Sequence, residues 1–418
     1  MAISRRDFLV GISSGVAGLA VGASLQHAPF KSDAPALALN VFDYRKLAKN
    51  RLPRIVWDFL EGGSGHERAL HHNLAVFDRL TFKPQRLTDI SRRNQSIELF
   101  GKTQASPFMI GPTGGNGSLW PDADLALARA AEQANIPFTL STPASNSIEE
   151  VATGAGGDQW FQLYVSSREQ SEWLVQRALK AGYSTLVLTI DVAVNGLRER
   201  DRRNNFKIPM NMTPAVIWDG ITHPRWSMDY LLNGPPELAN FVTEDAADLE
   251  AQANAMNRSL DATFDWAALR QLRELWPHTL LVKGILDADD AVQCIENGAD
   301  GIILSNHGGR QLADVISPLQ VLAETRQKIN KPILIDSGYR RGSDIVKSLA
   351  LGADCILLGR ATLYGLAARG QDGVSDVISI LQNEVDNTLA QIGCADVHEL
   401  NPGYLHEERV SLMQTGGV

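Results

Sequence analysis

Short apolar runs alternate with amphipathic segments through most of the chain after residue 100. The runs are almost continuously apolar, as expected of parallel strands covered on both faces, and most precede a segment with the 3.6-residue period of a helix. Helices are expected at residues 125–134, 266–276 and 319–329. The eight candidate strands are residues 108–114, 138–142, 160–165, 185–191, 280–285, 301–307, 332–338 and 355–360.

Eight strand–helix units in one chain predict the α/β class and, within it, a closed (β/α)8 barrel of the TIM type. The main competing fold is an open doubly wound sheet, which carries a Gly-x-Gly-x-x-Gly turn after its first strand. Residues 111–117 are rich in glycine but do not match that pattern. We therefore assign residues 101–405 to a barrel.

The segments that flank the barrel follow other patterns. Residues 31–100 are expected to form an N-terminal extension of helical turns and a short antiparallel piece, and residues 406–418 a tail. Ser-Arg-Arg-Asp-Phe-Leu at residues 4–9 precedes a short apolar run broken by glycines at residues 10–25. Residues 1–30 thus resemble a twin-arginine export signal, which implies a periplasmic protein, and the run is too weak for a transmembrane helix. A chance Arg-Arg pair before an amphipathic helix is the alternative.

One connection is far longer than a normal βα loop. About seventy residues, at about 192–263, separate the fourth predicted strand from the next helix. If exposed, the apolar middle of this insertion would suit a membrane surface or a partner protein, and if folded back it would form a lid over the barrel mouth. The sequence leaves both arrangements open. Prolines at 214, 224, 235 and 236 interrupt this segment. Its apolar residues fall within 210–232 and are Met210, Met212, Val216, Ile217, Trp218, Ile221, Trp226, Met228, Tyr230, Leu231 and Leu232.

Composition and charge narrow the function classes. The chain has 418 residues, of which 44% are hydrophobic and 21% charged, so it can bury a large core. Its 39 Lys and Arg against 48 Asp and Glu give a net charge of −9, without the basic excess that nucleic-acid binding needs. The three cysteines are scattered in apolar surroundings without CxxC spacing, so neither a metal site nor a disulfide framework is expected.

Polar residues end several predicted strands, at the rim where barrel enzymes carry their catalytic groups. The fourth strand ends at Asp191, the fifth carries Lys283, and the sixth ends in Ser-Asn-His-Gly-Gly-Arg at residues 305–310, which contains His307. A single polar residue of this kind often only caps a strand. Polar residues also end the seventh and eighth strands, and polar ends on five strands of one rim indicate an active site.

The ends of the seventh and eighth strands indicate a phosphate site. In such barrels these two loops commonly bind phosphate through glycine N–H groups and a basic side chain, which Gly338, Arg340, Gly359 and Arg360 would supply. A phosphorylated substrate would use this site as readily as a phosphate-bearing cofactor. The pattern alone leaves the two open.

Together these residues resemble the FMN-dependent 2-hydroxy-acid dehydrogenase and oxidase family. The resemblance spans residues 41–405, and the stretches 191–201, 223–227 and 359–370 are most similar to members that oxidise mandelate. It implies the barrel fold, FMN as cofactor and oxidation of an (S)-2-hydroxy acid, either bulky or aromatic (mandelate-like) or lactate-like, to the 2-keto acid. The motifs that carry it are Pro112-Thr113, Gln162-Leu163-Tyr164-Val165, Asp191, Arg198, Val282-Lys283-Gly284, the run from Ser305 to Arg310, Asp336-Ser337-Gly338 and Leu358-Gly359-Arg360.

The resemblance also implies catalytic and substrate-binding roles. His307 would be the base, and Asp191 would stabilise its imidazolium after proton uptake. Whether it takes the α-hydrogen as a proton, or the hydroxyl proton while hydride passes to the flavin, stays open. Arg310 and Arg198 would bind the substrate carboxylate in bidentate geometry, and Tyr164 would donate a hydrogen bond to a substrate oxygen.

The resemblance further implies a set of FMN contacts. Lys283 would lie at the edge of the flavin, where its charge offsets the negative charge of the reduced ring. The other expected FMN ligands are Pro112, Thr113, Gly114, Ser141, Gln162 and Thr189 around the ring, Ser305 and Asp336 along the ribityl chain, and Gly338, Arg340, Gly359 and Arg360 at the phosphate.

Three positions depart from common members of the family and bear on the substrate. Phe59 stands where many members place a tyrosine that helps to bind the substrate carboxylate. Pro143 and small neighbours stand where glycolate oxidase has a bulky tryptophan, and Gly114 replaces an alanine. We therefore expect a roomy pocket that prefers bulky or aromatic 2-hydroxy acids such as mandelate over glycolate.

The electron acceptor and two other function classes stay open. An exported enzyme with an apolar insertion suits transfer of electrons to a membrane quinone, with oxygen as the rival acceptor, and the resemblance implies a homo-oligomer, a tetramer. One alternative is another phosphate-binding barrel, such as a flavin-dependent isomerase or a nucleotide dehydrogenase, which would lack the His-x-x-Arg motif. The other is a flavin-bound binding protein with weak turnover, supported by Phe59 but opposed by His307, Asp191, Arg198 and Arg310.

Overall fold

The computed structural model describes residues 38–165, 167–206, 213–242 and 260–407, together with residues 210 and 252. The export signal expected at residues 1–30, Met212 of the insertion and most of the expected tail lie outside the described residues.

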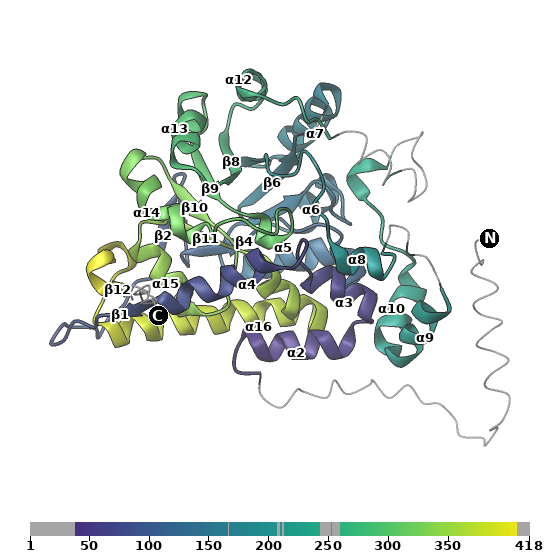
Figure 1. Ribbon diagram of the computed structural model, residues 1–418, viewed down its shortest axis with the longest axis horizontal. Helices are drawn as coiled ribbons and strands as arrows, with labels where there is room; N and C mark the ends of the chain where they lie inside the picture. The colour runs from purple at the N-terminus through teal and green to yellow at the C-terminus, as the bar shows by residue number, and fades with distance from the viewer. Residues whose placement is uncertain are drawn as a thin grey trace, which may run out of the picture.

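Eight parallel strands close into a barrel in the order β10-β11-β4-β5-β6-β7-β8-β9 (Figure 1). The (β/α)8 prediction is confirmed, and every candidate strand is present. Several strands are shorter than expected at their carboxyl ends, because the polar residues there leave the ladder and line the rim. The strands are β4 (Phe108–Ile110), β5 (Phe138–Ser141), β6 (Gln159–Tyr164), β7 (Thr185–Thr189), β8 (Thr279–Ile285), β9 (Gly301–Leu304), β10 (Ile333–Ile335) and β11 (Cys355–Leu358).

Helices cover the outside of the barrel between the strands (Figure 1). Those predicted at residues 125–134, 266–276 and 319–329 correspond to α5, α12 and α14. The start of α6 shows the local chemistry, since the Ser147 hydroxyl and the Glu150 carboxylate each accept the other's backbone N–H in a capping box. The helices are α5 (Ala123–Gln133), α6 (Ile148–Gly154), α7 (Arg168–Ala181), α12 (Trp266–Leu275), α13 (Ala288–Glu296), α14 (Leu319–Lys328), α15 (Gly342–Ala350) and α16 (Arg360–Ile392).

The N-terminal extension is helical and packs on the barrel, with α2 lying along α16 (Figure 1). Its antiparallel pieces are the hairpin β2–β3 and the pair β1–β12, in which a strand of the extension joins the last described strand of the chain. The elements are α2 (Val41–Arg51), α3 (Arg54–Glu61), α4 (Arg68–Ala75), η1 (Val76–Arg79), β1 (Leu80–Phe82), β2 (Ile97–Leu99), β3 (Lys102–Gln104) and β12 (Leu405–Glu407). Short 3-10 turns are η2 (Asn116–Ser118), η3 (Ala239–Phe241), η4 (His307–Gly309), η5 (Val397–Glu399) and η6 (Pro402–Tyr404).

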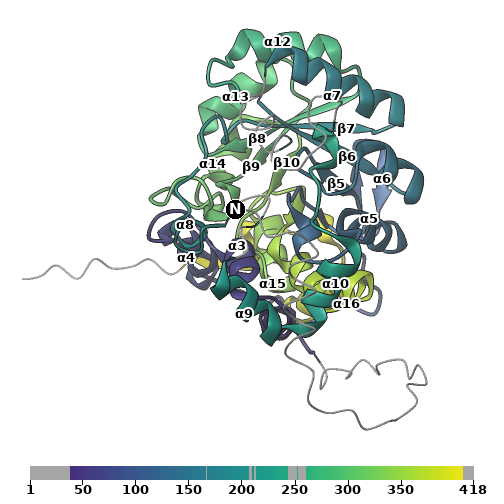
Figure 2. The same cartoon turned by 90° about the vertical axis from the view of Figure 1, so that its right-hand side faces the viewer.

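The insertion after β7 forms α8 (Glu199–Arg203), α9 (Pro214–Thr222) and α10 (Pro224–Asn233), seen from its own side in Figure 2. The prolines at 214 and 224 begin these helices rather than interrupt them, since proline suits the first helical position.

The apolar side chains of the insertion are divided between a packed face and an exposed one. The Trp226 side chain is buried, and its Nε1 donates to the carbonyl of Ser118 at 2.8 Å, so α10 covers the loop after β4. Other apolar side chains of α9 and α10 remain exposed: Trp218 (68%), Ile221 (55%), Met228 (56%) and Leu232 (74%).

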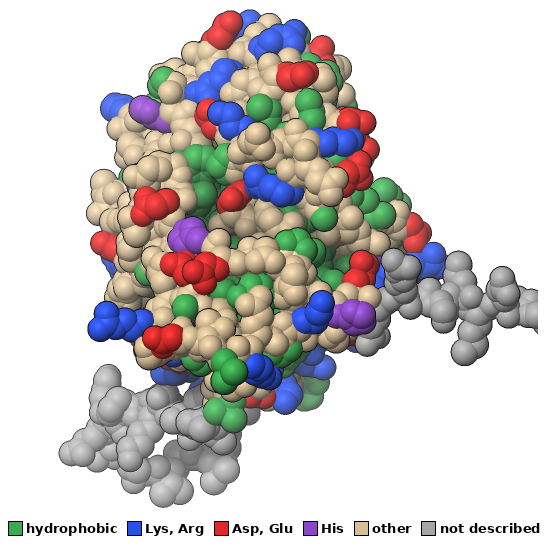
Figure 3. Space-filling model, turned by 90° about the vertical axis from the view of Figure 1, so that its left-hand side faces the viewer, with side chains coloured by type: hydrophobic (Ala, Val, Ile, Leu, Met, Phe, Trp, Pro, Cys, Tyr) green, Lys and Arg blue, Asp and Glu red, His purple; other side chains and the backbone are tan. Residues whose placement is uncertain are grey.

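The core and the surface follow the pattern seen in the sequence. Side chains of the barrel strands are almost all buried, whereas basic and acidic side chains are interspersed over the face shown in Figure 3. None of the helices in the described ranges combines the length and the apolar character needed to span a bilayer.

Candidate active site

The carboxyl ends of the strands bring the predicted catalytic residues to one rim of the barrel. Tyr164 is the last residue of β6, Asp191 follows β7, and His307 follows β9. The Nδ1 atom of His307 lies 3.0 Å from Oδ1 of Asp191, and the rings of His307 and Tyr164 are stacked with centroids 6.3 Å apart. These residues are far apart in the chain, so closure of the barrel is what assembles them.

The His307–Asp191 pair has the electrostatics of a base held by a carboxylate. Burial acts to raise the pKa of Asp191, but the charge and hydrogen bond of His307, with Lys283 nearby, hold that pKa below its usual value. Asp191 therefore remains charged near neutral pH. With Nδ1 directed at the carboxylate, Nε2 is the ring nitrogen available for proton transfer.

The loop that carries His307 is held in a strained conformation. His307 has a positive φ of 58°, which non-glycine residues seldom adopt. The Oγ of Ser305 accepts its backbone N–H at 3.0 Å, and the Oγ of Ser337 accepts the N–H of Gly308 at 3.1 Å. Contacts from β9 and β10 thus fix the backbone on both sides of the imidazole.

Arg310 lies partly buried between this loop and α3. Its Nη1 donates to the carbonyl oxygens of Phe59 at 2.7 Å and Gly62 at 3.0 Å, and its guanidinium lies over the Phe59 ring, 5.1 Å from the centroid. These carbonyls belong to the C-terminal end of α3, where unpaired acceptors and the helix dipole favour a cation.

Several guanidinium groups gather around Arg310. Burial, together with the charges of Arg198 and Arg360, lowers the pKa of Arg310 well below its ordinary value. Among the nearby carboxylates, Asp201 lies 3.6 Å from Arg198, and burial raises the pKa of Asp201. Clustered, partly desolvated arginines create a site that favours an anion.

Lys283 is a buried cation between two carboxylates. Its Nζ donates to Ser305 Oγ at 2.8 Å and forms an ion pair with Asp336 at 3.1 Å. Burial alone would lower the pKa of Lys283, but Asp336 and Asp191 more than offset this and raise it. The lysine therefore presents a fixed positive charge on the inner wall of the rim.

The residues expected around a flavin ring fit such a group. Gln162 accepts from the Ser141 hydroxyl at 2.7 Å through Oε1, while its buried Nε2 has no hydrogen-bond partner within the described part of the chain. The buried Thr189 hydroxyl, on the neighbouring strand, also lacks a partner among the described residues. Unsatisfied buried donors beside Lys283 suit the nitrogen and oxygen acceptors along the polar edge of an isoalloxazine ring.

The loop after β4, which contains Pro112 and Thr113, approaches its neighbours closely. A Cβ added at Gly114 would lie 2.5 Å from Cγ of Pro143, so a side chain there would push this loop away from the next one. The Asn116 side chain donates to the carbonyl and hydroxyl oxygens of Thr113 at 3.0 and 2.9 Å. The loop backbone is thereby fixed beside Gln162.

The four predicted phosphate ligands occupy different settings. Gly338 has a φ of 103°, and a Cβ there would lie 2.0 Å from the Asn73 carbonyl, so only glycine fits. Arg340 is buried, with its Nη1 on the carbonyl of Tyr339 at 2.9 Å. Gly359 is the N-cap of α16, the helix that Arg360 begins. A glycine turn before each of two helix N-termini suits a phosphate.

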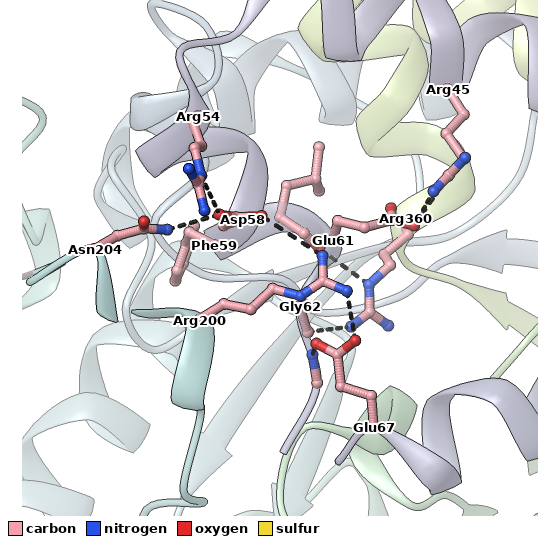
Figure 4. A network of polar contacts seen from close by, with 12 residues as sticks. Arg45, Arg54, Asp58, Phe59, Glu61, Gly62, Glu67, Arg200, Asn204 and Arg360 are labelled. Carbon is pink, nitrogen blue, oxygen red and sulfur yellow. Dashed lines mark hydrogen bonds and ion pairs between the residues drawn. The ribbon is translucent and has the colours of Figure 1, made fainter. Parts of the chain in front are cut away.

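The guanidinium of Arg360 is engaged with the protein. It donates to the carbonyl oxygen of Gly62 at 2.7 Å (Figure 4) and to that of Leu60 at 3.0 Å. It also donates to the carbonyl oxygen of Gly308 at 2.9 Å, so it ties α3 to the His307 loop. A contact between this side chain and a phosphate stays a prediction.

The sequence reasoning missed three amide side chains that support the catalytic loop. Asn73 of α4 and Asn306 exchange hydrogen bonds of 2.8 and 2.7 Å, and Gln311 donates to the Asp191 carbonyl at 2.9 Å. Asn306 and Gln311 adjoin the motif that contains His307, which was a usable signal. Asn73 lies in a helix of the extension, and nothing in its local pattern points to the site.

Comparison with known proteins agrees with this geometry. The family model for FMN-dependent dehydrogenases matches residues 48–407. The chain is 59% identical to (S)-mandelate dehydrogenase of Pseudomonas putida over 372 residues, covering 89% of this chain and 95% of that protein. It is 38% identical to an L-lactate oxidase of a Nostoc species over 377 residues, covering 88% and 98% of the two chains.

Solved structures show the same relationship. The crystal structure of the monotopic membrane protein (S)-mandelate dehydrogenase superposes with a TM-score of 0.88 at 59% identity, covering 88% of this chain and 99% of that one. A mandelate oxidase variant with (S)-mandelic acid superposes with a TM-score of 0.75 at 32% identity, covering 89% and 99%.

The closed barrel and the charged side chains on its rim are those of a flavin-binding (β/α)8 oxidoreductase. The chain belongs to the FMN-dependent dehydrogenase family and is an FMN-dependent enzyme that oxidises 2-hydroxy acids. The resemblance found in the sequence, including the similarity to members that oxidise mandelate, is confirmed.

Proposed function

We propose that this enzyme oxidises a bulky, aromatic (S)-2-hydroxy acid of the mandelate type to the 2-keto acid. The observation that carries the proposal is the cluster of partly buried guanidinium groups near the His307–Asp191 pair, which suits a carboxylate next to a carbon that loses hydrogen. The aromatic preference is supported by Phe59, which stacks on Phe206 with ring centroids 4.5 Å apart, and by the small residues of the loop after β5.

Each residue has a defined task in this proposal. Arg198 and Arg310 bind the substrate carboxylate, and the Tyr164 hydroxyl donates to a substrate oxygen. His307 accepts the proton at Nε2, and Asp191 stabilises the resulting imidazolium. FMN, when bound, would supply the acceptor for the two electrons and for the second hydrogen that the substrate loses.

The cofactor contacts follow from the same geometry. Lys283 offsets negative charge at the flavin edge, and the unsatisfied donors of Gln162 and Thr189 bind its acceptors. The expected ring neighbours are Pro112, Thr113, Gly114 and Ser141. Ser305 is expected beside the ring or the ribityl chain and Asp336 at the ribityl hydroxyls, and the expected phosphate ligands are Gly338, Arg340, Gly359 and Arg360.

Anaerobic stopped-flow reduction of the enzyme-bound flavin tests the substrate. We expect faster bleaching with mandelate than with glycolate, and the opposite order would refute the proposed specificity. Arg198→Lys and Arg310→Lys should each raise KM by about ten- to a hundredfold, because a bidentate ionic contact is lost. Unchanged KM values in both variants would refute the carboxylate assignment.

We also propose that α9 and α10 dock on a membrane and that quinone is the electron acceptor. The support is the exposed group of Trp218, Ile221, Met228 and Leu232, and the monotopic membrane protein to which the chain is similar. Binding to phospholipid vesicles tests the docking, and flavin reoxidation by vesicles with and without ubiquinone tests the electron acceptor. Replacing these four residues with serine should abolish vesicle binding and quinone reduction but spare flavin bleaching, whereas Leu87→Ser, at an exposed residue outside the insertion, should change nothing. Rapid reoxidation of the reduced flavin by air alone would instead favour oxygen as the electron acceptor.

We further propose export by the twin-arginine route and assembly into a homo-oligomer, a tetramer. Replacing Arg5 and Arg6 with lysine should keep the protein in the cytoplasm, as measured by cell fractionation. Export that persists in this variant would refute the signal. Sedimentation velocity of the holoenzyme measures the assembly, and a monomer would refute it.

A further inference from the structure

Arg200, the second residue of α8, reaches the N-terminal extension and contacts two carboxylates there (Figure 4). Its guanidinium forms an ion pair with Glu67 at 2.5 Å and lies 3.5 Å from an oxygen of Asp58. The carboxylate side chains are only 11% and 13% exposed, respectively. Asp58 also pairs with Arg54 and accepts from Asn204, and Glu67 accepts the N–H of Gly63. Because a buried carboxylate is costly without a cation, the charge of Arg200, which both carboxylates share, helps to keep them in place.

The aliphatic part of Arg200 lies against the residue that holds the substrate-site arginine. A Cβ added at Gly62 would lie 3.5 Å from Cδ of Arg200. The carbonyl oxygen of Gly62 accepts from Arg310 at 3.0 Å and from Arg360 at 2.7 Å. A displacement of Arg200 would therefore reach Arg310 through Gly62.

The same segment of the extension also fixes the backbone on both sides of Arg198. The N–H of Gly65 donates to the carbonyl of Leu197 at 2.9 Å, immediately before Arg198. Two residues after Arg198, the side chain of Arg200 is bound to Glu67. The extension therefore contacts the chain immediately before Arg198 and again two residues after it, which restricts where Arg198 can lie.

Glu67 is close enough to Arg360 to act on it. Burial lowers the pKa of Arg360, and the charges of Glu61 and Glu67 act against this effect. Without Arg200, Glu67 would be an unpaired carboxylate beside guanidinium groups that favour an anion. It would then compete with the carboxylate of the substrate.

We propose that Arg200 is a positioning residue for substrate binding: by pairing with Glu67 and Asp58 it keeps Arg198 and Arg310 in place and free for the substrate carboxylate. This inference rests on the proposed role of those two arginines. Arg200 acts through them and through Gly62.

The test compares steady-state kinetics of the holoenzyme variants Arg200→Met, Glu67→Gln and the double variant with mandelate. Arg200→Met should raise KM by about tenfold or more with kcat within about threefold and FMN content unchanged. The double variant should have a KM at least about threefold below that of Arg200→Met but above that of the wild type, because the competing carboxylate is gone while the contacts of Arg200 are still missing. The matched control is Arg203→Met, on the same helix, whose side chain is 72% exposed and pairs with Glu199.

Two results would overturn the inference. One is a KM in Arg200→Met equal to that of the control, and the other is a raised KM that Glu67→Gln does not lower, which would indicate a merely structural role. If Arg200→Met yields no holoenzyme, Arg200→Lys takes its place, with a smaller rise in KM that Glu67→Gln again partly reverses. Unchanged KM in Arg198→Lys and Arg310→Lys would instead refute the proposed carboxylate site itself, so the two failures are distinguishable.

Discussion

Replacing Asp191 with asparagine removes the charge that faces His307 while keeping an oxygen acceptor of the same size. In the native enzyme Nδ1 of His307 lies 3.0 Å from the carboxylate, and the two side chains are only 22% and 16% exposed. Proton uptake by the imidazole then creates a cation next to an anion. The variant leaves that cation beside a neutral amide.

The distance sets the size of the effect. Two unit charges 3.0 Å apart attract by about 5.5 kcal/mol at an effective dielectric constant of about 20. Desolvation and the retained hydrogen bond reduce the net difference to about 1.5–3 kcal/mol, the range for hydrogen bonds to charged groups. The rate of flavin reduction by a saturating substrate should therefore fall about 10- to 150-fold in Asp191→Asn.

Anaerobic stopped-flow bleaching of the flavin, with mandelate at saturation, measures this rate directly. Asp289→Asn is the control, since that carboxylate is 84% exposed and pairs with Lys328 on the outside of the barrel. A rate in Asp191→Asn within about threefold of the wild type, with FMN fully bound, would refute the assigned role of the carboxylate.

Other predictions concern carboxylate binding, the flavin edge and pH. Phe59→Tyr should lower KM for a 2-hydroxy acid at least about fivefold, because it adds a hydroxyl donor for the substrate carboxylate. A KM that improves for no acid would contradict the view that the two arginines alone bind this carboxylate. Lys283→Met should lose FMN, or its flavin should be reduced at least about tenfold more slowly, because Asp336 is left without the cation 3.1 Å away. Absorbance spectra that show full flavin content and bleaching at the wild-type rate would contradict this prediction. Burial raises the pKa of Asp124 to about 6, above its value in the unfolded chain, so its contribution to the free energy of unfolding is fully present below about pH 4 and is lost as the pH rises through about 6. Urea unfolding of wild type and Asp124→Asn between pH 4 and 7.5 should show their difference shifting by about 3 kcal/mol, and a constant difference would contradict the burial argument.

Much of the site was predictable because barrel enzymes concentrate chemistry at the carboxyl ends of strands. Asp191, Lys283 and His307 each follow or end an apolar run, so their common rim could be inferred once eight runs were recognised. The helices α9 and α10 were harder, because their apolar residues are divided between a buried face at Trp226 and an exposed one at Trp218. Composition alone does not separate those faces.

The sequence by itself determined the barrel, the rim residues and the family, because apolar periodicity and strand-end motifs are local properties of the chain. Only the tertiary structure decided that α3 offers its last carbonyls to Arg310 and Arg360, and that Arg200 pairs with Glu67 across the insertion and the extension. Those contacts join residues more than a hundred positions apart. Such contacts depend on how closed layers pack, and no local pattern encodes that packing.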